Sequence, residues 1–216
     1  SYPYYNLLEI LTHIRHSEKV FIMKRLLLIL ILTFSFQNLA KADDIRDFQI
    51  EFISLGDSLL DHFTKKEIED FTNDDLYNYK NDKTFLGVAF YPPKYKFDKY
   101  EALSFEYKRN DKNYIIHGIT GKIVTKYKND IRSCHIKQDN TFKELSKLFE
   151  NQKVYSVKTK SHNADKTGRS KARQSGFEFS NGDMVIIACY NWHKDTGYSS
   201  NFKINLFTEE LNGWLN

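Results

Sequence analysis

Alternating apolar and polar positions predict most of the regular structure in this chain. A period of two is typical of half-buried strands, and short apolar runs bounded by turn residues also indicate strands. Asn181-Gly182 separates two such runs, and Asn-Gly between strands is the strongest short signature of a β-hairpin. The pairs Asn110-Asp111 and Thr120-Gly121 predict turns that join three further runs into an antiparallel meander. The nine predicted strands are 47–52, 85–90, 102–107, 113–118, 122–127, 154–159, 175–180, 183–190 and 202–207.

Four short helices are predicted among these strands. The first is expected at 58–63, the second opens with a capping box, the third carries an apolar stripe to Phe149, and the fourth ends the chain. The expected N-caps are, in order, Asp57, Thr64, either Asn140 or Thr141, and Thr208. Residues 72–84 and 160–170 are polar and predicted to be loops. Because strands mostly follow strands, the pattern predicts an α+β fold with an antiparallel sheet meander and hairpin and short helices, in a single compact domain.

The segment Met23 to Ala42 has the three parts of a secretory signal peptide. Lys24-Arg25 precedes an eleven-residue apolar run at 26–36, and Ala40-Lys41-Ala42 supplies small residues for cleavage before Asp43. An uncleaved membrane anchor is the alternative, but a span needs about 20 apolar residues. We therefore predict a signal peptide at 23–42, an upstream extension outside the fold at 1–22, and one α+β domain at 43–216. The mature protein is then periplasmic or secreted and has no transmembrane anchor.

The charge balance of the expected mature part argues against a nucleic-acid partner. Residues 1–42 hold five of the 32 basic and two of the 28 acidic residues, which leaves 27 basic and 26 acidic residues in 43–216. Nucleic-acid-binding domains usually keep a strong basic excess.

Cys134 and Cys189 are the only cysteines of the chain. In an oxidising compartment an isolated pair usually forms a disulfide. A two-cysteine metal site or a catalytic thiol are the alternatives, but neither cysteine lies in a CxxC motif, and His135 beside Cys134 lacks the usual ligand spacing. No P-loop, dinucleotide fingerprint, HExxH or EF-hand motif occurs, so no cofactor and no metal are predicted.

Gly56-Asp57-Ser58-Leu59 resembles the block that carries the nucleophilic serine of GDSL esterases. The resemblance implies Ser58 as nucleophile beside Asp57, but it covers only about 53–61. A serine nucleophile also needs a base and oxyanion donors, and the family's late Asp-x-x-His and Gly-x-Asn-Asp patterns are absent. The alternative is a glycine turn followed by a helix cap. Trp192 and His193 follow Cys189 closely, and we expect Trp192 to cover the disulfide.

A basic stretch near the predicted hairpin is a candidate anion-binding site. It includes Lys160, Lys166, Arg169, Lys171 and Arg173. Such a patch could bind an anionic envelope component, although a solvated loop running into an edge strand explains the same residues.

A wider resemblance rests on three features: the signal segment, the run Phe-Gln-Ile-Glu-x-Ile-Ser-Leu-Gly-Asp-Ser-Leu-Leu-Asp from residue 48, and Ala-Cys-Tyr-Asn-Trp from residue 188. With these the chain resembles uncharacterised exported proteins of AT-rich marine alphaproteobacteria, a group without an assigned activity. The expectation is therefore an exported, non-catalytic binding or envelope-interaction domain, with a serine hydrolase using Ser58 as the competing hypothesis.

Overall fold

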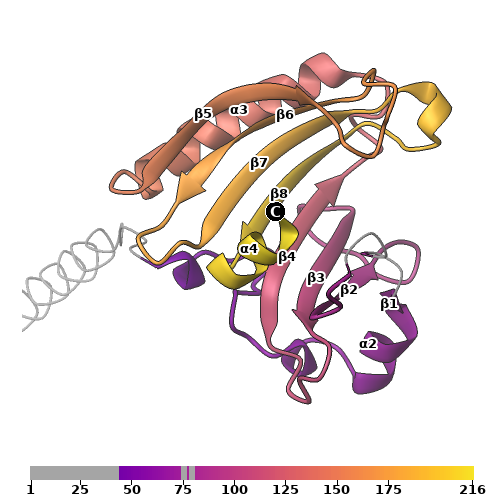
Figure 1. Cartoon of the computed structure of the whole chain (residues 1–216), viewed down its shortest axis with the longest axis vertical. Helices are drawn as coiled ribbons and strands as arrows, with labels where there is room; N and C mark the ends of the chain where they lie inside the picture. Colours follow the sequence, from indigo (N-terminus) through magenta and orange to yellow (C-terminus); the bar gives the residue numbers. More distant parts are fainter. Residues whose placement is uncertain (1–43, 74–76, 78–80) are drawn as a thin grey trace, which may run out of the picture. The chain divides into compact units, whose positions relative to one another are not determined.

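Eight strands pair into one antiparallel sheet in the computed structural model, which describes residues 44–73, 77 and 81–216 (Figure 1). The order across the sheet is β1-β2-β3-β4-β8-β7-β6-β5, so two four-stranded meanders meet where β4 pairs with β8. The strands are β1 (Thr72–Asn73), β2 (Phe85–Phe90), β3 (Ala102–Lys108), β4 (Ile116–Ile123), β5 (Lys153–Ser161), β6 (Lys171–Glu178), β7 (Met184–Asn191) and β8 (Asn201–Phe207). The predicted α+β class with an antiparallel sheet is confirmed.

Three α-helices and three short 3-10 helices complete the part of the chain that the structure describes. The longest, α3, connects the two meanders and lies along β6, β7 and β8 on one face of the sheet (Figure 1). Helix α2 packs on β2, and α4 packs on β4. The helices are α2 (Lys65–Phe71), α3 (Ile131–Leu148), α4 (Glu209–Leu215), η1 (Ile45–Asp47), η2 (Leu59–Asp61) and η3 (Lys194–Thr196).

The face that α3 covers holds the hydrophobic core. Side chains that are directly paired across antiparallel strands lie on the same face, so the register groups them into rows. One row on the α3 side is buried and apolar from β2 to β6. Its members are Val88, Phe105, Ile119, Leu206, Val185 and Phe177. Positions one residue away point to the opposite face, which we call the polar face.

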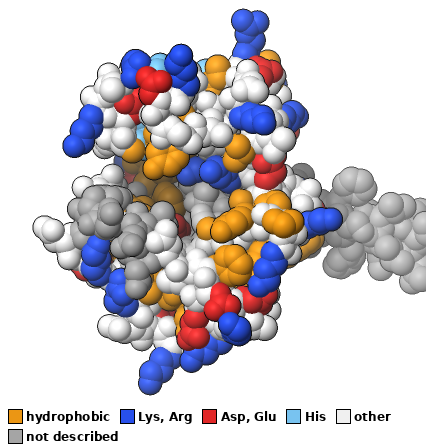
Figure 2. Space-filling view, turned by 90° about the vertical axis from the view of Figure 1, so that its right-hand side faces the viewer, with side chains coloured by type: hydrophobic (Ala, Val, Ile, Leu, Met, Phe, Trp, Pro, Cys, Tyr) orange, Lys and Arg blue, Asp and Glu red, His pale blue; other side chains and the backbone are white. Residues whose placement is uncertain are grey.

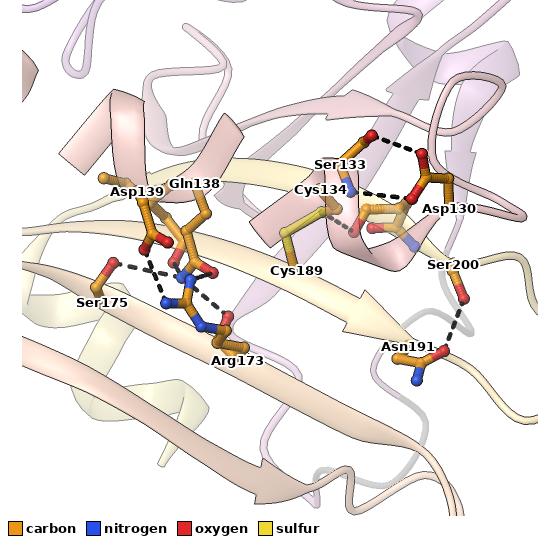
Figure 3. Close-up of a disulfide and its surroundings, with 12 residues drawn as sticks. Asp130, Ser133, Cys134, Gln138, Asp139, Arg173, Ser175, Cys189, Asn191 and Ser200 are labelled. Carbon is orange, nitrogen blue, oxygen red and sulfur yellow. Dashed lines mark hydrogen bonds and ion pairs between the residues drawn. A yellow bond between two sulfur atoms is a disulfide. The ribbon is translucent and has the colours of Figure 1, made fainter. Parts of the chain in front are cut away.

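Helix α3 is attached to the sheet by a disulfide and a buried amide. Cys134 bonds to Cys189 of β7, as the sequence predicted (Figure 3). One turn later, the buried side chain of Gln138 donates from Nε2 to the carbonyl oxygens of Arg173 and Ile187, at 3.1 and 2.9 Å. Buried amides are stable only when they are hydrogen-bonded, so Gln138 fixes the helix against β6 and β7.

The predicted strand at 47–52 is wrong. Residues 45–47 form η1, and Glu51 and Phe52 follow in a turn with φ of 53° and 66°. The Glu51 carboxylate accepts hydrogen bonds from the backbone amides of Asp98, Lys99 and Tyr100. The turn at Glu51 is therefore held by hydrogen bonds to residues 98–100, which are distant in sequence. The local alternation of apolar and polar residues cannot reveal such a contact.

The two strands predicted at 113–118 and 122–127 are instead one strand, β4, which runs through Thr120 and Gly121. Gly121 serves close packing there, not a turn: a Cβ on it would lie 2.7 Å from the ring of Tyr100. Helix α3 begins at Ile131 with Asp130 as its N-cap, so the predicted start at Asn140 or Thr141 is also wrong.

The predicted capping box of Thr64 and Glu67, the Thr208 cap of α4 and the hairpin around Asn181-Gly182 are all present. The cap of the helix predicted at 58–63 is Ser58 and not Asp57, and only Leu59–Asp61 is helical. The predicted extension at 1–22, the signal peptide at 23–42 and part of the predicted loop at 72–84 lie outside the described residues. Within the described ranges, no helix combines the length and the apolar character that a membrane span requires.

Candidate functional site

A row of lysines crosses the polar face of the sheet. The register pairs five residues side by side on β5, β6, β7, β8 and β4, in the order Lys158, Gln174, Ala188, Lys203 and Lys122. We call this set the lysine row. Gln174 and both central lysines are half-buried, whereas Lys158 at the sheet edge is exposed. Three cations therefore share one line of neighbouring strands.

Lys122 and Lys203 are directly opposite each other on β4 and β8. Like charges in directly opposed positions destabilise a sheet. Among the described residues neither lysine has a carboxylate within ion-pair distance. The ring of Tyr190 lies near Lys203, with its centroid 5.0 Å from Nζ. This pair keeps a repulsion that an anion placed between the ammonium groups would relieve.

Burial of Lys122 and Lys203 makes their charged forms unfavourable. Desolvation, and next to it the charge of Lys122, lowers the pKa of Lys203 to about 8. Desolvation also lowers the pKa of Lys122, and the neighbouring Glu101 opposes this effect. The pKa of His162 is lowered by burial and by Lys203 and Lys160. Burial and neighbouring positive charge thus act together on Lys203 and His162.

Glu106 is a buried acidic group of this face, and Glu178 of β6, at the other end of the same row, is paired with Lys153. Glu106 lies on β3 and pairs with Gly118 of β4, where a Cβ would come within 2.3 Å of its Oε2. Its Oε1 accepts a hydrogen bond of 2.8 Å from the Tyr77 hydroxyl, while Oε2 has no hydrogen-bond partner within the described ranges. Burial raises the pKa of this carboxyl against the opposing effects of Tyr77 and Lys203. Glu106 is therefore poorly suited to neutralise the lysines.

The row between Glu106 and the lysine row is neutral and hydrogen-bonded. Thr120 Oγ1 donates to Asn205 Oδ1 at 2.9 Å, and Asn205 Nδ2 donates to the carbonyl oxygen of Ile186 at 3.1 Å. These contacts occupy the polar groups next to the lysines. Among the residues that the structure describes, the ammonium groups of Lys122 and Lys203 have no ion-pair partner.

An apolar hollow adjoins the exposed end of the lysine row. It has a volume of about 170 Å³, and the residues that line it include Gly176, Met184, Ile186, Lys158 and Gln174. Figure 2 shows a recess on one side of the molecule, with Lys or Arg side chains in its depth and hydrophobic side chains along its margins. Apolar walls with a few convergent polar groups are typical of small-molecule sites.

A cluster of aromatic rings lies on the polar face where β5 and β7 end. Trp192 contacts His162 at 4.2 Å and Tyr198 at 4.7 Å between ring centroids, and it stacks on Tyr190 at 6.2 Å. The expectation that Trp192 covers the disulfide is wrong, because Cys189 points to the α3 side and Trp192 contacts Tyr190 on the polar face.

The structure does not bring the five predicted anion-binding residues together on one face. Lys160 is on the polar face, beside Ala172 and Tyr190 in the register. Arg173 points to α3, where its guanidinium bonds Gln138 and Asp139 at 2.7 Å each (Figure 3). Arg169 donates to Asp195 at 3.0 Å, Lys171 donates to Ser161 at 2.9 Å, and Lys166 is exposed in the loop before β6. Strand alternation separates residues that are close in sequence.

Ser58, the other predicted candidate, is held in a structural turn. Its hydroxyl donates to the carbonyl oxygen of Asn113 at 2.5 Å and accepts from the amide of Leu60 at 3.1 Å. Asp57 accepts from the amide of Ser54 and lies 3.7 Å from His62 Nε2. Among the described residues no histidine is hydrogen-bonded to Ser58, so the hydroxyl has no base to accept its proton.

Sequence reasoning missed the lysine row because its members come from five strands. The one available signal was the alternation Asn-Phe-Lys-Ile-Asn-Leu-Phe in β8, which places Lys203 on a polar side. Within the described ranges, no group of three or more His, Cys, Asp or Glu side chains could hold a metal ion. Comparisons with family models, with curated proteins and with solved structures found no match to this chain.

Proposed function

We propose that this protein is an exported binding domain without catalytic turnover, and that the lysine row on the polar face binds an organic anion. The observation that carries the proposal is the opposed pair of Lys122 and Lys203, which lacks a carboxylate partner among the described residues. A charge-assisted hydrogen bond from each ammonium group to one acidic group would replace the repulsion by attraction.

The surroundings of the row favour an anion that also carries an apolar part. Ile186 and Met184 line the hollow beside Lys158, and the ring of Tyr190 lies against Lys203. A fully hydrophilic polyanion would leave these surfaces without a partner. The anionic envelope component expected from the sequence fits this chemistry if it is amphipathic.

Export is supported by the signal segment at 23–42 and by the disulfide between Cys134 and Cys189. Disulfides persist in oxidising compartments and are rare in the cytosol. The competing hypothesis, a serine hydrolase using Ser58, has less support because the Ser58 hydroxyl already donates to a backbone carbonyl.

Titration with 8-anilinonaphthalene-1-sulfonate tests the proposal, because this probe joins a sulfonate to an apolar ring system and reports binding by fluorescence. The parent protein is expected to bind it at one site. The double variant Lys122→Gln/Lys203→Gln should bind at least about tenfold more weakly, since it loses two charge-assisted contacts.

The matched control is Lys166→Gln/Lys171→Gln, which removes the same charge from residues that are not part of the lysine row. Its affinity should equal that of the parent. If the two double variants weaken binding equally, the probe responds to net charge alone and the proposed site is wrong. Circular dichroism of both variants confirms that they are folded.

A further inference from the structure

Lys203 is distinguished from the other lysines of the polar face by its position. It lies on a central strand between β4 and β7, opposite Lys122, and its Nζ is 5.0 Å from the Tyr190 ring. Lys158, on the same row, is at the exposed edge of the sheet. An amine next to another cation and shielded from water is the usual setting of a nucleophilic lysine.

We propose that Lys203 captures carbonyl compounds covalently as an imine, and that Lys122 holds a carboxylate adjacent to that carbonyl. The ligand class is therefore a 2-oxo acid or an aldehyde acid. This inference rests on the proposed function in that it uses the same anion site, and it adds a covalent step to it.

The step is a condensation without any redox change. The neutral Nζ attacks the carbonyl carbon and passes one proton to the carbonyl oxygen, which gives a neutral carbinolamine. Loss of its hydroxyl group and of the remaining proton on nitrogen, together as water, forms the carbon–nitrogen double bond of a neutral imine. One further proton, supplied by solvent, gives the iminium ion. Hydrolysis reverses every step, so the ligand is released unchanged.

The charges that face Lys203 favour this chemistry. Lys122 on β4 and His162 after β5 are basic groups, Tyr190 on β7 presents its ring, and Glu106 on β3 is buried, with its pKa raised. Burial and Lys122 lower the pKa of Lys203 to about 8, so a substantial part of its amine is neutral near that pH. An ordinary lysine, with a pKa near 10.4, is almost entirely protonated there.

Reductive trapping of the purified parent protein tests the inference. Glyoxylate serves as the probe, sodium cyanoborohydride reduces any imine to a stable secondary amine, and peptide mapping by mass spectrometry locates the modified lysines. We expect Lys203 to be modified at least about tenfold faster than the exposed Lys158, because near pH 8 the neutral fraction of its amine is larger than that of an ordinary lysine by roughly two orders of magnitude. The rate at Lys203 should level off above about pH 8, so its advantage over an ordinary lysine should shrink as the pH rises further.

Two controls make the result specific. Lys203→Arg keeps the positive charge but cannot form the imine. Modification of residue 203 should therefore disappear while the protein stays folded. Propanal, which lacks the carboxylate, should react with Lys203 of the parent more slowly than glyoxylate, and Lys122→Gln should reduce this preference.

The outcomes separate this inference from the proposed function. If Lys203 is modified no faster than Lys158 in a protein that binds the sulfonate probe at the lysine row, the covalent inference is overturned and the binding site stands. If Lys203 is modified preferentially but the Lys122→Gln/Lys203→Gln variant binds the sulfonate probe like the parent, the proposed anion site fails and the reactive lysine stands.

Discussion

Replacing Lys203 by methionine should change how the stability of the protein depends on pH. The side chain is half-buried opposite Lys122, and its pKa is lowered from 10.5 to about 8. Between these two pH values the unfolded chain binds the proton and the native state does not, so the free energy of unfolding rises with pH across this range. Below about pH 8 the native state carries the full desolvation cost of the charged lysine.

The size of this cost follows from the two pKa values. At about 1.4 kcal/mol per pH unit, the gap between 10.5 and about 8 corresponds to about 3.5 kcal/mol, and partial exposure of the side chain reduces this to at most about 3 kcal/mol. Lys203→Met removes the titrating group. The free energy of unfolding of the variant should therefore exceed that of the parent by up to about 3 kcal/mol at pH 7 and by clearly less at pH 10.

The assay is urea unfolding at pH 7 and pH 10, followed by tryptophan fluorescence. Lys158→Met is the matched control, because Lys158 lies on the same row but is exposed, and its effect should be the same at both pH values. The reasoning is refuted if the stability difference between Lys203→Met and the parent does not change between pH 7 and pH 10.

Three further predictions concern groups that hold the fold. Replacing both Cys134 and Cys189 by alanine should lower the free energy of unfolding by about 4 kcal/mol in urea titrations, since the bond closes a loop of 55 residues; a loss under about 1 kcal/mol would contradict this. Glu106→Gln should raise the melting temperature at pH 7 but not at pH 4, because burial raises the carboxyl pKa and ionisation above about pH 4.5 favours the unfolded chain; equal shifts at both pH values would exclude this explanation. Ser58→Ala should cost about 1 kcal/mol through loss of the cap and leave fluorophosphonate labelling unchanged; labelling of the parent that the variant lacks would favour the hydrolase.

Local sequence patterns predicted correctly those caps and turns whose hydrogen bonds are made within a few residues along the chain. The capping box at Thr64, the cap at Thr208 and the Asn181-Gly182 hairpin all depend on contacts within a few residues, and all are present. The fold class followed from the order of these elements.

The errors arose where distant contacts override the local signal. Thr120-Gly121 looks like a turn, but β4 continues through it because the Tyr100 ring fills the space beside Gly121. The first turns of α3 look polar, yet the buried Gln138 is satisfied by Arg173 and Ile187 of two different strands.

The candidate site could not be predicted from sequence for the same reason. Lys122 and Lys203 meet only because β4 pairs with β8, and the register between two separate meanders is set by the buried apolar row that includes Ile119 and Leu206. The sequence drew attention to a basic stretch that strand alternation divides between the two faces.

The lysine side chains can be observed while an anion binds to the polar face. In nuclear magnetic resonance spectra with labelled lysines, addition of 8-anilinonaphthalene-1-sulfonate should shift the side-chain signals of Lys122 and Lys203 together, with one common dissociation constant. The signals of Lys166 and Lys171 should stay in place. Shifts confined to Lys166 and Lys171, or spread equally over all exposed lysines, would contradict the assignment of the lysine row as the binding site.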